Sequence, residues 1–380
     1  MKVSSYLYIN GNIEKSKNEN FVDTNKCQLL IGFGEKKYLI ENPTFEGLKK
    51  KFPNATIALC STAGEIFASE VLNNSLTLTA IEFEKTKVQS ANINISQYKS
   101  SFEAGVALIQ KLDQKDLKYV FVLSDGGMVN GSELVRGIET IINHKIPVTG
   151  GLAGDGTDFQ STLVGLNEDP KTGNILAVGL YGNNIKIGHG SMGGWEMFGL
   201  EKKITKSISN ELFEIDNANA LDIYKEYLGK YANELPSSAL LFPLSIKLNE
   251  SENPIVRTIL SINNETKSMI FAGDVPEGSK VRFMKANFDK LIDAASDAAE
   301  SSLVNLKEST PKLAILISCV GRKIILDKRI DEEVEAVINV LGTDAVITGF
   351  YSYGEISPLH PNTKCELHNQ TMTITTFDEI

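Results

Sequence analysis

Apolar runs and polar breaks divide the chain into three units that share one order of elements. Each unit begins with a continuous apolar run rich in β-forming residues, continues through a glycine-containing or charged turn and a helical stretch, and closes with a second apolar run. The first runs cover 28–33, 119–123 and 313–318, and the second runs end near Leu59, Thr149 and Phe350. Apolar runs joined by one helix are typical of parallel strands with a right-handed crossover. We therefore predict three β-α-β units.

A small-residue turn that ends in a carboxylate follows the second run of each unit. The turns read CSTAGEI at 60–66, GGLAGD at 150–155 and GFYSYGEI at 349–356, so that Glu65, Asp155 and Glu355 take corresponding places. Ligands of parallel sheets bind beyond the carboxyl ends of the strands. Because small residues at those ends leave space and expose backbone amides, we expect a ligand cavity there.

The remaining runs alternate apolar and polar residues, as half-buried antiparallel strands do. The fold class predicted is α/β with α+β mixed sheets: two related domains, built from duplicated β-α-β-acidic-turn units with antiparallel additions. The expected parts are an N-terminal arm or edge strand at 1–24, an N-terminal domain at 25–230 and a C-terminal domain at 231–380. A last strand is expected over 367–377.

Composition excludes several classes of partner. The 380 residues carry a formal net charge of -10, which gives no basic surface for nucleic acid or anionic lipid. No apolar window reaches the length of a membrane span, and the polar N-terminus predicts no signal peptide, so a cytoplasmic location is expected. The four cysteines are widely spaced and predict neither a disulfide framework nor a zinc site.

The two Gly-Glu-Ile turns, together with LHNQT at 367–371, resemble the FIST sensory proteins, which consist of a FIST N-terminal and a FIST C-terminal domain. LFP at 241–243, Arg257 and FAGDVPEG at 271–278 are similar to the C-terminal domain, and Gly150–Gly156 and Gly190–Gly194 to the N-terminal one. The resemblance covers the chain from about residue 25. It implies a bacterial, cytoplasmic signal-transduction protein that binds a small molecule, with an amino acid or derivative as the expected ligand and no catalytic activity. Since the chain carries no output region, the signal is expected to pass to a separate protein such as a histidine kinase, a cyclic-nucleotide enzyme or a chemotaxis component.

The expected ligand site combines the acidic turns with residues of the resembling motifs. An amino acid would place its ammonium on Glu355 or Asp155 and its carboxylate on Arg257, with Tyr353 or Trp195 over its aliphatic part. The alternative for each carboxylate is a structural role, as an acceptor for nearby backbone amides. The full set of candidate ligand-binding residues is Cys60, Ser61, Thr62, Glu65, Gly151, Asp155, Trp195, Arg257, Ser352, Tyr353, Glu355, His368 and Asn369.

Two other functions stay open at this point. Cys60 or Ser61 could serve a small-molecule hydrolase or transferase, but Leu59 stands where a Gly-x-Ser-x-Gly elbow requires glycine. The resemblance also includes haem-based nitric oxide sensors, for which His368 is the candidate ligand, although a structural histidine in a strand is the plainer interpretation. No cofactor is expected otherwise, and no pair of histidines has the spacing of a zinc site.

Overall fold

A computed structural model describes residues 1–19, 21–42, 45–247, 253–304, 306, 309–360 and 363–380. In each predicted unit the two apolar runs form a parallel strand pair, which confirms the mixed α/β class built from repeated units. The pairs are β3 (Leu29–Glu35) with β4 (Thr56–Thr62), β9 (Leu117–Ser124) with β10 (Val148–Leu152), and β22 (Leu313–Cys319) with β23 (Val346–Ser352).

Each parallel pair is the centre of a six-stranded mixed sheet. The first sheet runs β11 (Val164–Leu166), β4, β3, β7 (Leu76–Glu82), β1 (Lys2–Ile9), β2 (Asn12–Lys17). The second runs β25 (Cys365–His368), β24 (Gly354–Pro358), β10, β9, β12 (Asn174–Tyr181), β8 (Lys87–Asn94). The third runs β6 (Glu70–Leu72), β5 (Glu65–Phe67), β23, β22, β26 (Met372–Glu379), β13 (Ile185–Met192).

The three sheets exchange strands in a ring. The strand after each acidic turn leaves its own unit: β5 joins β23 of the third sheet, β24 joins β10 of the second, and β11, which follows the turn at Asp155, joins β4 of the first. Every acidic turn therefore lies where two units meet, rather than at the edge of one sheet.

The inner faces of all three sheets share one apolar core, and helices cover the outer faces. Phe33, Phe121, Ile317 and Phe350 are at most 2% exposed in this core, and the rings of Phe33 and Phe350 stack at 4.8 Å. The helices and 3-10 turns outside the sheets are α1 (Lys36–Glu41), α2 (Phe45–Lys51), η1 (Ile95–Gln97), α3 (Ser101–Gln110), α4 (Gly131–Ile142), α6 (Phe288–Leu303), α7 (Val320–Leu326), η4 (Asp327–Arg329) and α8 (Ile330–Leu341). We call residues 1–195 and 286–380, which form these layers, the core of the protein.

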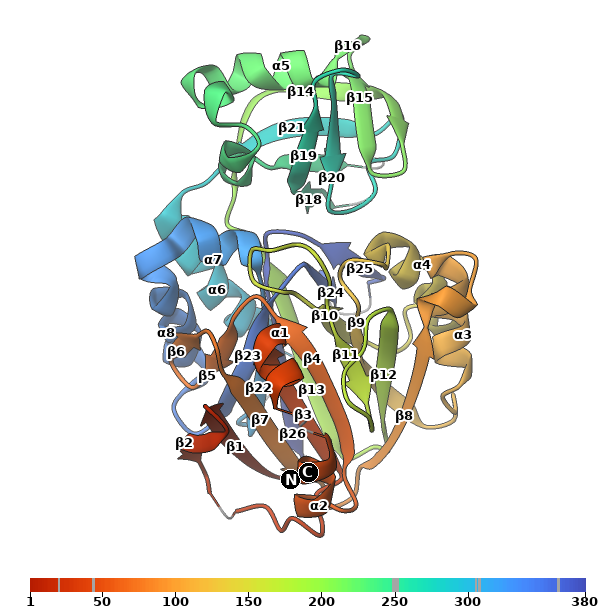
Figure 1. Ribbon diagram of the computed structural model, residues 1–380, viewed down its shortest axis with the longest axis vertical. Helices are drawn as coiled ribbons and strands as arrows, with labels where there is room; N and C mark the ends of the chain where they lie inside the picture. The colour runs from red at the N-terminus through yellow and green to blue at the C-terminus, as the bar shows by residue number, and fades with distance from the viewer. Residues whose placement is uncertain (20, 43–44, 248–252, 305, 307–308, 361–362) are drawn as a thin grey trace.

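Residues 196–285 form a separate small lobe above the core (Figure 1). Its sheet has the order β18 (Ile255–Arg257), β17 (Leu244–Lys247), β21 (Lys280–Lys285), β14 (Glu196–Ile208), β15 (Glu211–Ile215), β20 (Ser268–Phe271), β19 (Ile259–Asn263), with β16 (Ala218–Asn219) beside β15. It also contains α5 (Ala220–Leu228), η2 (Gly229–Glu234) and η3 (Ser237–Leu241). The lobe is inserted between β13 and α6, and residue 230, where the sequence pattern placed a domain boundary, lies inside it.

The single last strand predicted over 367–377 is wrong, because the chain breaks between β25 and β26. Gln370 adopts a left-handed conformation, with φ of 61°, which a continuous strand cannot contain. The break puts β25 in the second sheet and β26 in the third, and leaves Asn369 at the end of the core that faces the small lobe. Among the residues described, none of the helices combines the length and apolar character needed to span a bilayer.

Candidate ligand-binding site

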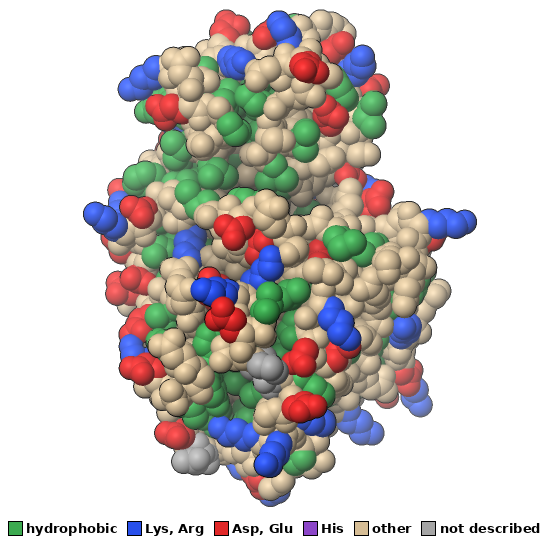
Figure 2. Space-filling view, in the orientation of Figure 1, with side chains coloured by type: hydrophobic (Ala, Val, Ile, Leu, Met, Phe, Trp, Pro, Cys, Tyr) green, Lys and Arg blue, Asp and Glu red, His purple; other side chains and the backbone are tan. Residues whose placement is uncertain are grey.

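A cavity of about 410 Å³ lies between the core and the small lobe, beyond the carboxyl ends of β9 and β22. The core contributes the loop 126–131, Leu152, the loop 159–162, residues 319–321, Tyr353 and Asn369. The lobe contributes Asn210, Leu240, Thr258, Leu260 and residues 271–273. Of the predicted site residues, Tyr353 and Asn369 are in this wall. Figure 2 shows hydrophobic side chains gathered where the lobe meets the core, while acidic and basic side chains are mixed elsewhere on this face.

The cavity wall contains no Asp, Glu, Lys or Arg among the described residues, but it contains buried polar atoms without a protein partner. Neither polar side-chain atom of Asn369, nor the hydroxyl of Thr258, makes a hydrogen bond to any residue that the structure describes, and the two residues are 0% and 4% exposed. Buried polar groups are nearly always hydrogen-bonded, and those that are not need an explanation. Here both groups lie in the wall of one cavity, on opposite parts of the molecule.

The loop after β9 has a fixed shape. The carboxylate of Asp125 accepts hydrogen bonds from the backbone amides of Gly127 at 2.8 Å, Met128 at 2.7 Å and Gly173 at 2.8 Å. A Cβ atom at Gly126 would lie 2.1 Å from the carbonyl oxygen of Ala153, so only glycine fits there. The cavity wall is thus preformed by backbone, as in most small-molecule sites.

The two predicted glutamates, Glu65 and Glu355, turn inward and have the same arrangement. Glu65 accepts hydrogen bonds from the hydroxyls of Thr62 and Ser75, the latter at 2.7 Å. Glu355 accepts them from the hydroxyl of Ser352 at 2.6 Å and from the amide and hydroxyl of Thr371 at 3.1 and 2.9 Å.

Both glutamates are fully buried and neither lies in the cavity wall. Burial raises the pKa of each carboxyl to about 7, and the hydrogen bonds only partly oppose it. In this structure Glu65 and Glu355 therefore act as acceptors of hydrogen bonds within the protein, with Thr62 and Ser352 among their hydroxyl donors.

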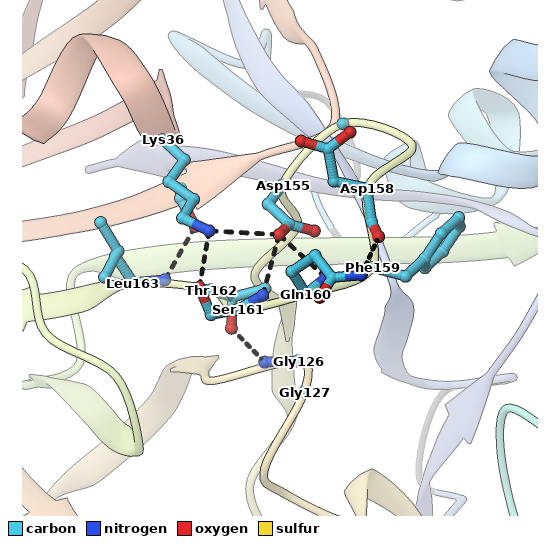
Figure 3. A network of polar contacts seen from close by, with 12 residues as sticks. Lys36, Gly126, Gly127, Asp155, Asp158, Phe159, Gln160, Ser161, Thr162 and Leu163 are labelled. Carbon is cyan, nitrogen blue, oxygen red and sulfur yellow. Dashed lines mark hydrogen bonds and ion pairs between the residues drawn. The ribbon is translucent and has the colours of Figure 1, made fainter.

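Asp155 differs from the two glutamates because it faces charged and backbone donors (Figure 3). It accepts from the amides of Gln160 and Ser161 at 3.1 and 2.9 Å, from the Tyr353 hydroxyl, and from Lys36 Nζ at 3.4 Å. Burial alone would raise the pKa of Asp155, but these hydrogen bonds outweigh burial and lower the pKa.

Tyr353 connects the acidic turn at Asp155 to the cavity. Besides its bond to Asp155, its ring stacks on Phe159 with centroids 4.7 Å apart, and both rings line the cavity. The carboxylate of Asp155 thus positions one aromatic side of the cavity without entering the wall itself.

Arg257 joins the lobe to the core rather than facing the cavity. It donates from Nε to the carbonyl of Asp274 at 3.0 Å and from Nη1 to the carbonyl of Leu367 in β25 at 3.0 Å, and burial lowers its pKa to about 10. The Asp274 carboxylate in turn accepts from Asn130 Nδ2 at 3.0 Å and Arg136 Nη1 at 2.7 Å, at the start of α4. Neither Glu355 nor Arg257 lies in the cavity wall, so the structure does not place them on either side of one ligand, as the sequence predicted.

The remaining candidates have structural neighbours. Cys60 lies in the shared core with its thiol pKa raised by burial, and the Ser61 hydroxyl accepts from the amide of Leu163 at 2.8 Å. Trp195 Nε1 donates to the carbonyl of Gln370 at 2.9 Å. His368 Nε2 lies 2.8 Å from the carbonyl oxygen of Ser357, and burial lowers its pKa.

Gly151 is inside β10, where an added Cβ would lie 2.9 Å from the side chain of Ile317. No group of three or more His, Cys, Asp or Glu side chains suited to a metal occurs in the described part of the chain.

Most of the cavity wall was missed by sequence reasoning. The loop 126–131 and residues 319–321 follow the first strand of their units, whereas the acidic turns that predict the site follow the second strand. Parallel strands place the turns after the first and after the second strand at the same edge of the sheet. The Gly126-Gly127 pair in the sequence could therefore have indicated this part of the cavity wall. The lobe residues, such as Thr258, carry no such signal, because only the tertiary fold brings them over the core.

Comparison with known proteins places this fold in a family. The family model of the FIST N domain matches residues 28–218, and that of the FIST C domain matches residues 220–358. The chain belongs to the FIST family. FIST domains are associated with small-ligand sensing in signalling proteins, and the cavity described above lies between parts contributed by both matches.

Solved structures and curated proteins add little to this assignment. A crystal structure described as cyanuric acid hydrolase from A. caulinodans aligns with a TM-score of 0.38 and 8% identity, over 94% of this chain and 91% of that one. A second cyanuric acid hydrolase structure aligns with a TM-score of 0.35 and 10% identity, over 100% and 99% of the two chains. No protein with a curated description matches this FIST sequence.

Proposed function

We propose that this FIST protein is a sensor that binds a small ligand, an amino acid or an amino-acid derivative, in the cavity between the core and the small lobe. The observation that carries the proposal is the cavity of about 410 Å³, with the unpartnered Asn369 amide on the core side and the unpartnered Thr258 hydroxyl on the lobe side. Its size falls within the ordinary range for small-molecule sites.

Binding in this cavity would be coupled to the position of the lobe. The ligand would touch residues of both parts, whose present contact combines polar groups around Asp274 and Arg257 with apolar packing of Leu240 and Leu241 against the core. A ligand shifts a conformational equilibrium by its difference in affinity for the two states. We propose that the lobe transmits occupancy to a separate signalling protein, such as a histidine kinase, a cyclic-nucleotide enzyme or a chemotaxis component.

The proposal is tested by ligand-induced thermal stabilisation with a panel of free, N-acylated and amidated amino acids. A ligand that binds only the folded state stabilises it by RT ln(1 + [L]/Kd), about 2.7 kcal/mol at a hundred times Kd, so the melting temperature should rise with concentration. The blocking variant is Gly127→Leu, because a Cβ there meets only Asp125 Oδ1 at 3.7 Å and the position lines the cavity.

The matched control is Gly47→Leu in α2, where an added Cβ meets nothing within 4 Å. Wild type and Gly47→Leu should respond alike, and Gly127→Leu should lose the response. Absence of a shift across the whole panel, or an unchanged response in Gly127→Leu, contradicts the proposal.

A further inference from the structure

The side chain of Asn369 has a hydrogen-bonding capacity that the protein does not use. It follows β25 directly, is 0% exposed, and neither Oδ1 nor Nδ2 has a partner among the described residues. A carboxamide presents an acceptor and two donors in one plane. An unpartnered buried amide destabilises a fold, so a ligand that bonds it gains by satisfying it. Both amide atoms of Asn369 are buried in the ligand-free protein, so a ligand in the cavity bonds them only after the Asn369 side chain turns or the wall around it opens.

The surroundings of Asn369 select against charged partners. The wall holds apolar side chains such as Leu152, Leu240 and Val320, and none of its described residues is charged. The nearby carboxylates of Asp125 and Glu355 are already engaged by hydrogen bonds from backbone amides or hydroxyls. A free carboxylate or ammonium placed here would be desolvated without a free counter-charge, because the buried Arg322 beside the cavity is already paired with Glu333, and this is strongly unfavourable.

We propose that the ligand presents a neutral amide to Asn369, in a paired arrangement in which Nδ2 donates to the ligand carbonyl and Oδ1 accepts from the ligand N–H. This inference rests on the proposed function and narrows its ligand class to amino-acid derivatives whose carboxylate is amidated. The Thr258 hydroxyl, on the lobe side of the same cavity, provides a further polar contact, and the rings of Tyr353 and Phe159 provide apolar area. A site built to bond an N–H and a carbonyl rejects analogues that lack them, since its own polar groups are then left unpaired.

Three probes test this inference: N-acetyl-leucinamide, which is neutral, N-acetyl-leucine, which carries a free carboxylate, and free leucine, a zwitterion without an acetyl group. Their binding is measured by thermal shift and by isothermal titration calorimetry. The amide should bind more tightly than the carboxylate, and the carboxylate more tightly than the zwitterion. Asn369→Leu, which keeps the branching and the number of side-chain heavy atoms and removes the amide, should weaken the binding of N-acetyl-leucinamide by about ten- to a hundred-fold.

The chain offers a matched control in the adjacent residue. Gln370 is also fully buried with both amide atoms unpartnered, but it packs against Gly321 and is not part of the cavity wall. Gln370→Met should bind N-acetyl-leucinamide as the wild type does. This separates recognition by Asn369 from a general effect of removing a buried amide.

The outcomes distinguish this inference from the function on which it rests. If free leucine or N-acetyl-leucine binds as tightly as the amide, or if Asn369→Leu binds the amide unchanged, the amide inference is overturned while the sensor proposal stands. If none of these probes and no member of the wider amino-acid panel binds, both are overturned.

Discussion

Two of the three junctions between units are closed by a lysine, and the third is not. Lys36, directly after β3, reaches Asp155 and the Ser161 hydroxyl in the turn of the second unit. Lys323, in the helix after β22, donates to the carbonyl of Ala63 at 2.7 Å in the turn of the first unit. At the third junction β9 is followed by Asp125, whose carboxylate binds backbone amides, and then by Gly126 and Gly127 beside Tyr353, and there the cavity lies.

This difference shows how one repeated scaffold can carry a single site. The hydroxyl and carboxylate arrangement is duplicated at Glu65 and Glu355, so the acidic turn does not decide where a ligand binds. The junctions differ in the residue that a neighbouring unit places against the acidic turn. They differ also in their cover, because the lobe lies only over the end of the molecule near β9 and β22. The site that we propose therefore lies at the junction that no lysine side chain fills.

The largest expected effect comes from breaking the buried ion pair beside the cavity. Arg322 donates to Glu333 at 2.7 Å and to the carbonyls of Gly193 and Leu291 at 2.6 and 2.7 Å, and both ionised side chains are 0% exposed. Arg322→Met leaves the Glu333 charge uncompensated, so the free energy of unfolding should fall by about 3–5 kcal/mol in urea titrations. Arg329→Met, which breaks two exposed ion pairs, with Asp289 and Glu332, is the control and should have no measurable effect.

Sequence reasoning recovered the repeated units because their strands are buried on both faces, which gives continuous apolar runs such as those around Ile31, Phe121 and Ile317. It did not recover the exchange of β5, β11 and β24 between sheets, since these short strands pair with segments far away in the chain and leave no local pattern. The same limit applies to the lobe, whose connections to the core are only a few residues long. Asn369 and Tyr353 were named as candidates, but the reason that they matter, an amide and a ring in a cavity wall, is tertiary.

The second effect is on the pH dependence of stability. It should be equal for Glu65, at a junction closed by a lysine, and for Glu355, at the third junction. The folded-state pKa of Glu65 and of Glu355 is about 7, against 4.5 in the unfolded chain. Between pH 4.5 and pH 7 each carboxyl is therefore protonated in the folded state and ionised in the unfolded chain. Each carboxyl contributes stability that is fully present below pH 4.5 and is lost as pH rises to 7, on the order of 3 kcal/mol at 1.36 kcal/mol per unit.

The measurement is a difference between variants, because the lowered pKa of His189, about 4, acts with opposite sign over an overlapping range. Glu65→Gln and Glu355→Gln should each gain stability relative to wild type between pH 5 and pH 8. Lys323 and Glu35 act on Glu65, and Arg322 acts on Glu355, but the direction is the same for both. A difference from wild type that does not change with pH would contradict the assigned pKa values.

The third effect is a gain in stability at the third junction. Asn369→Leu replaces an unpartnered buried amide by an apolar side chain with the same number of heavy atoms, and the cavity beside it has room for the larger methyl groups, so the ligand-free protein should become more stable by about 1–2 kcal/mol. Chemical unfolding without ligand measures it. A loss of stability would show that the amide has a structural role within the protein.

The smallest effect is expected from Lys323, the lysine that closes the junction at the turn of the first unit, which we call the first junction. Lys323 Nζ is partly buried, donates to Ala63 and to Asn73 Oδ1, and lies 5.6 Å from the centre of the Tyr351 ring. Lys323→Met keeps most of the apolar stem and removes these hydrogen bonds, so the free energy of unfolding should fall by about 1 kcal/mol.

The matched control for Lys323→Met is Lys37→Met, whose side chain is 72% exposed and lies 3.9 Å from the Glu41 carboxylate. Unlike Asn369→Leu, Lys323→Met should leave ligand-induced stabilisation unchanged, because the first junction takes no part in the cavity. If Lys323→Met instead abolished that stabilisation, the closed and the third junctions would be coupled, and the lysine would be part of the sensing mechanism rather than a substitute for a site.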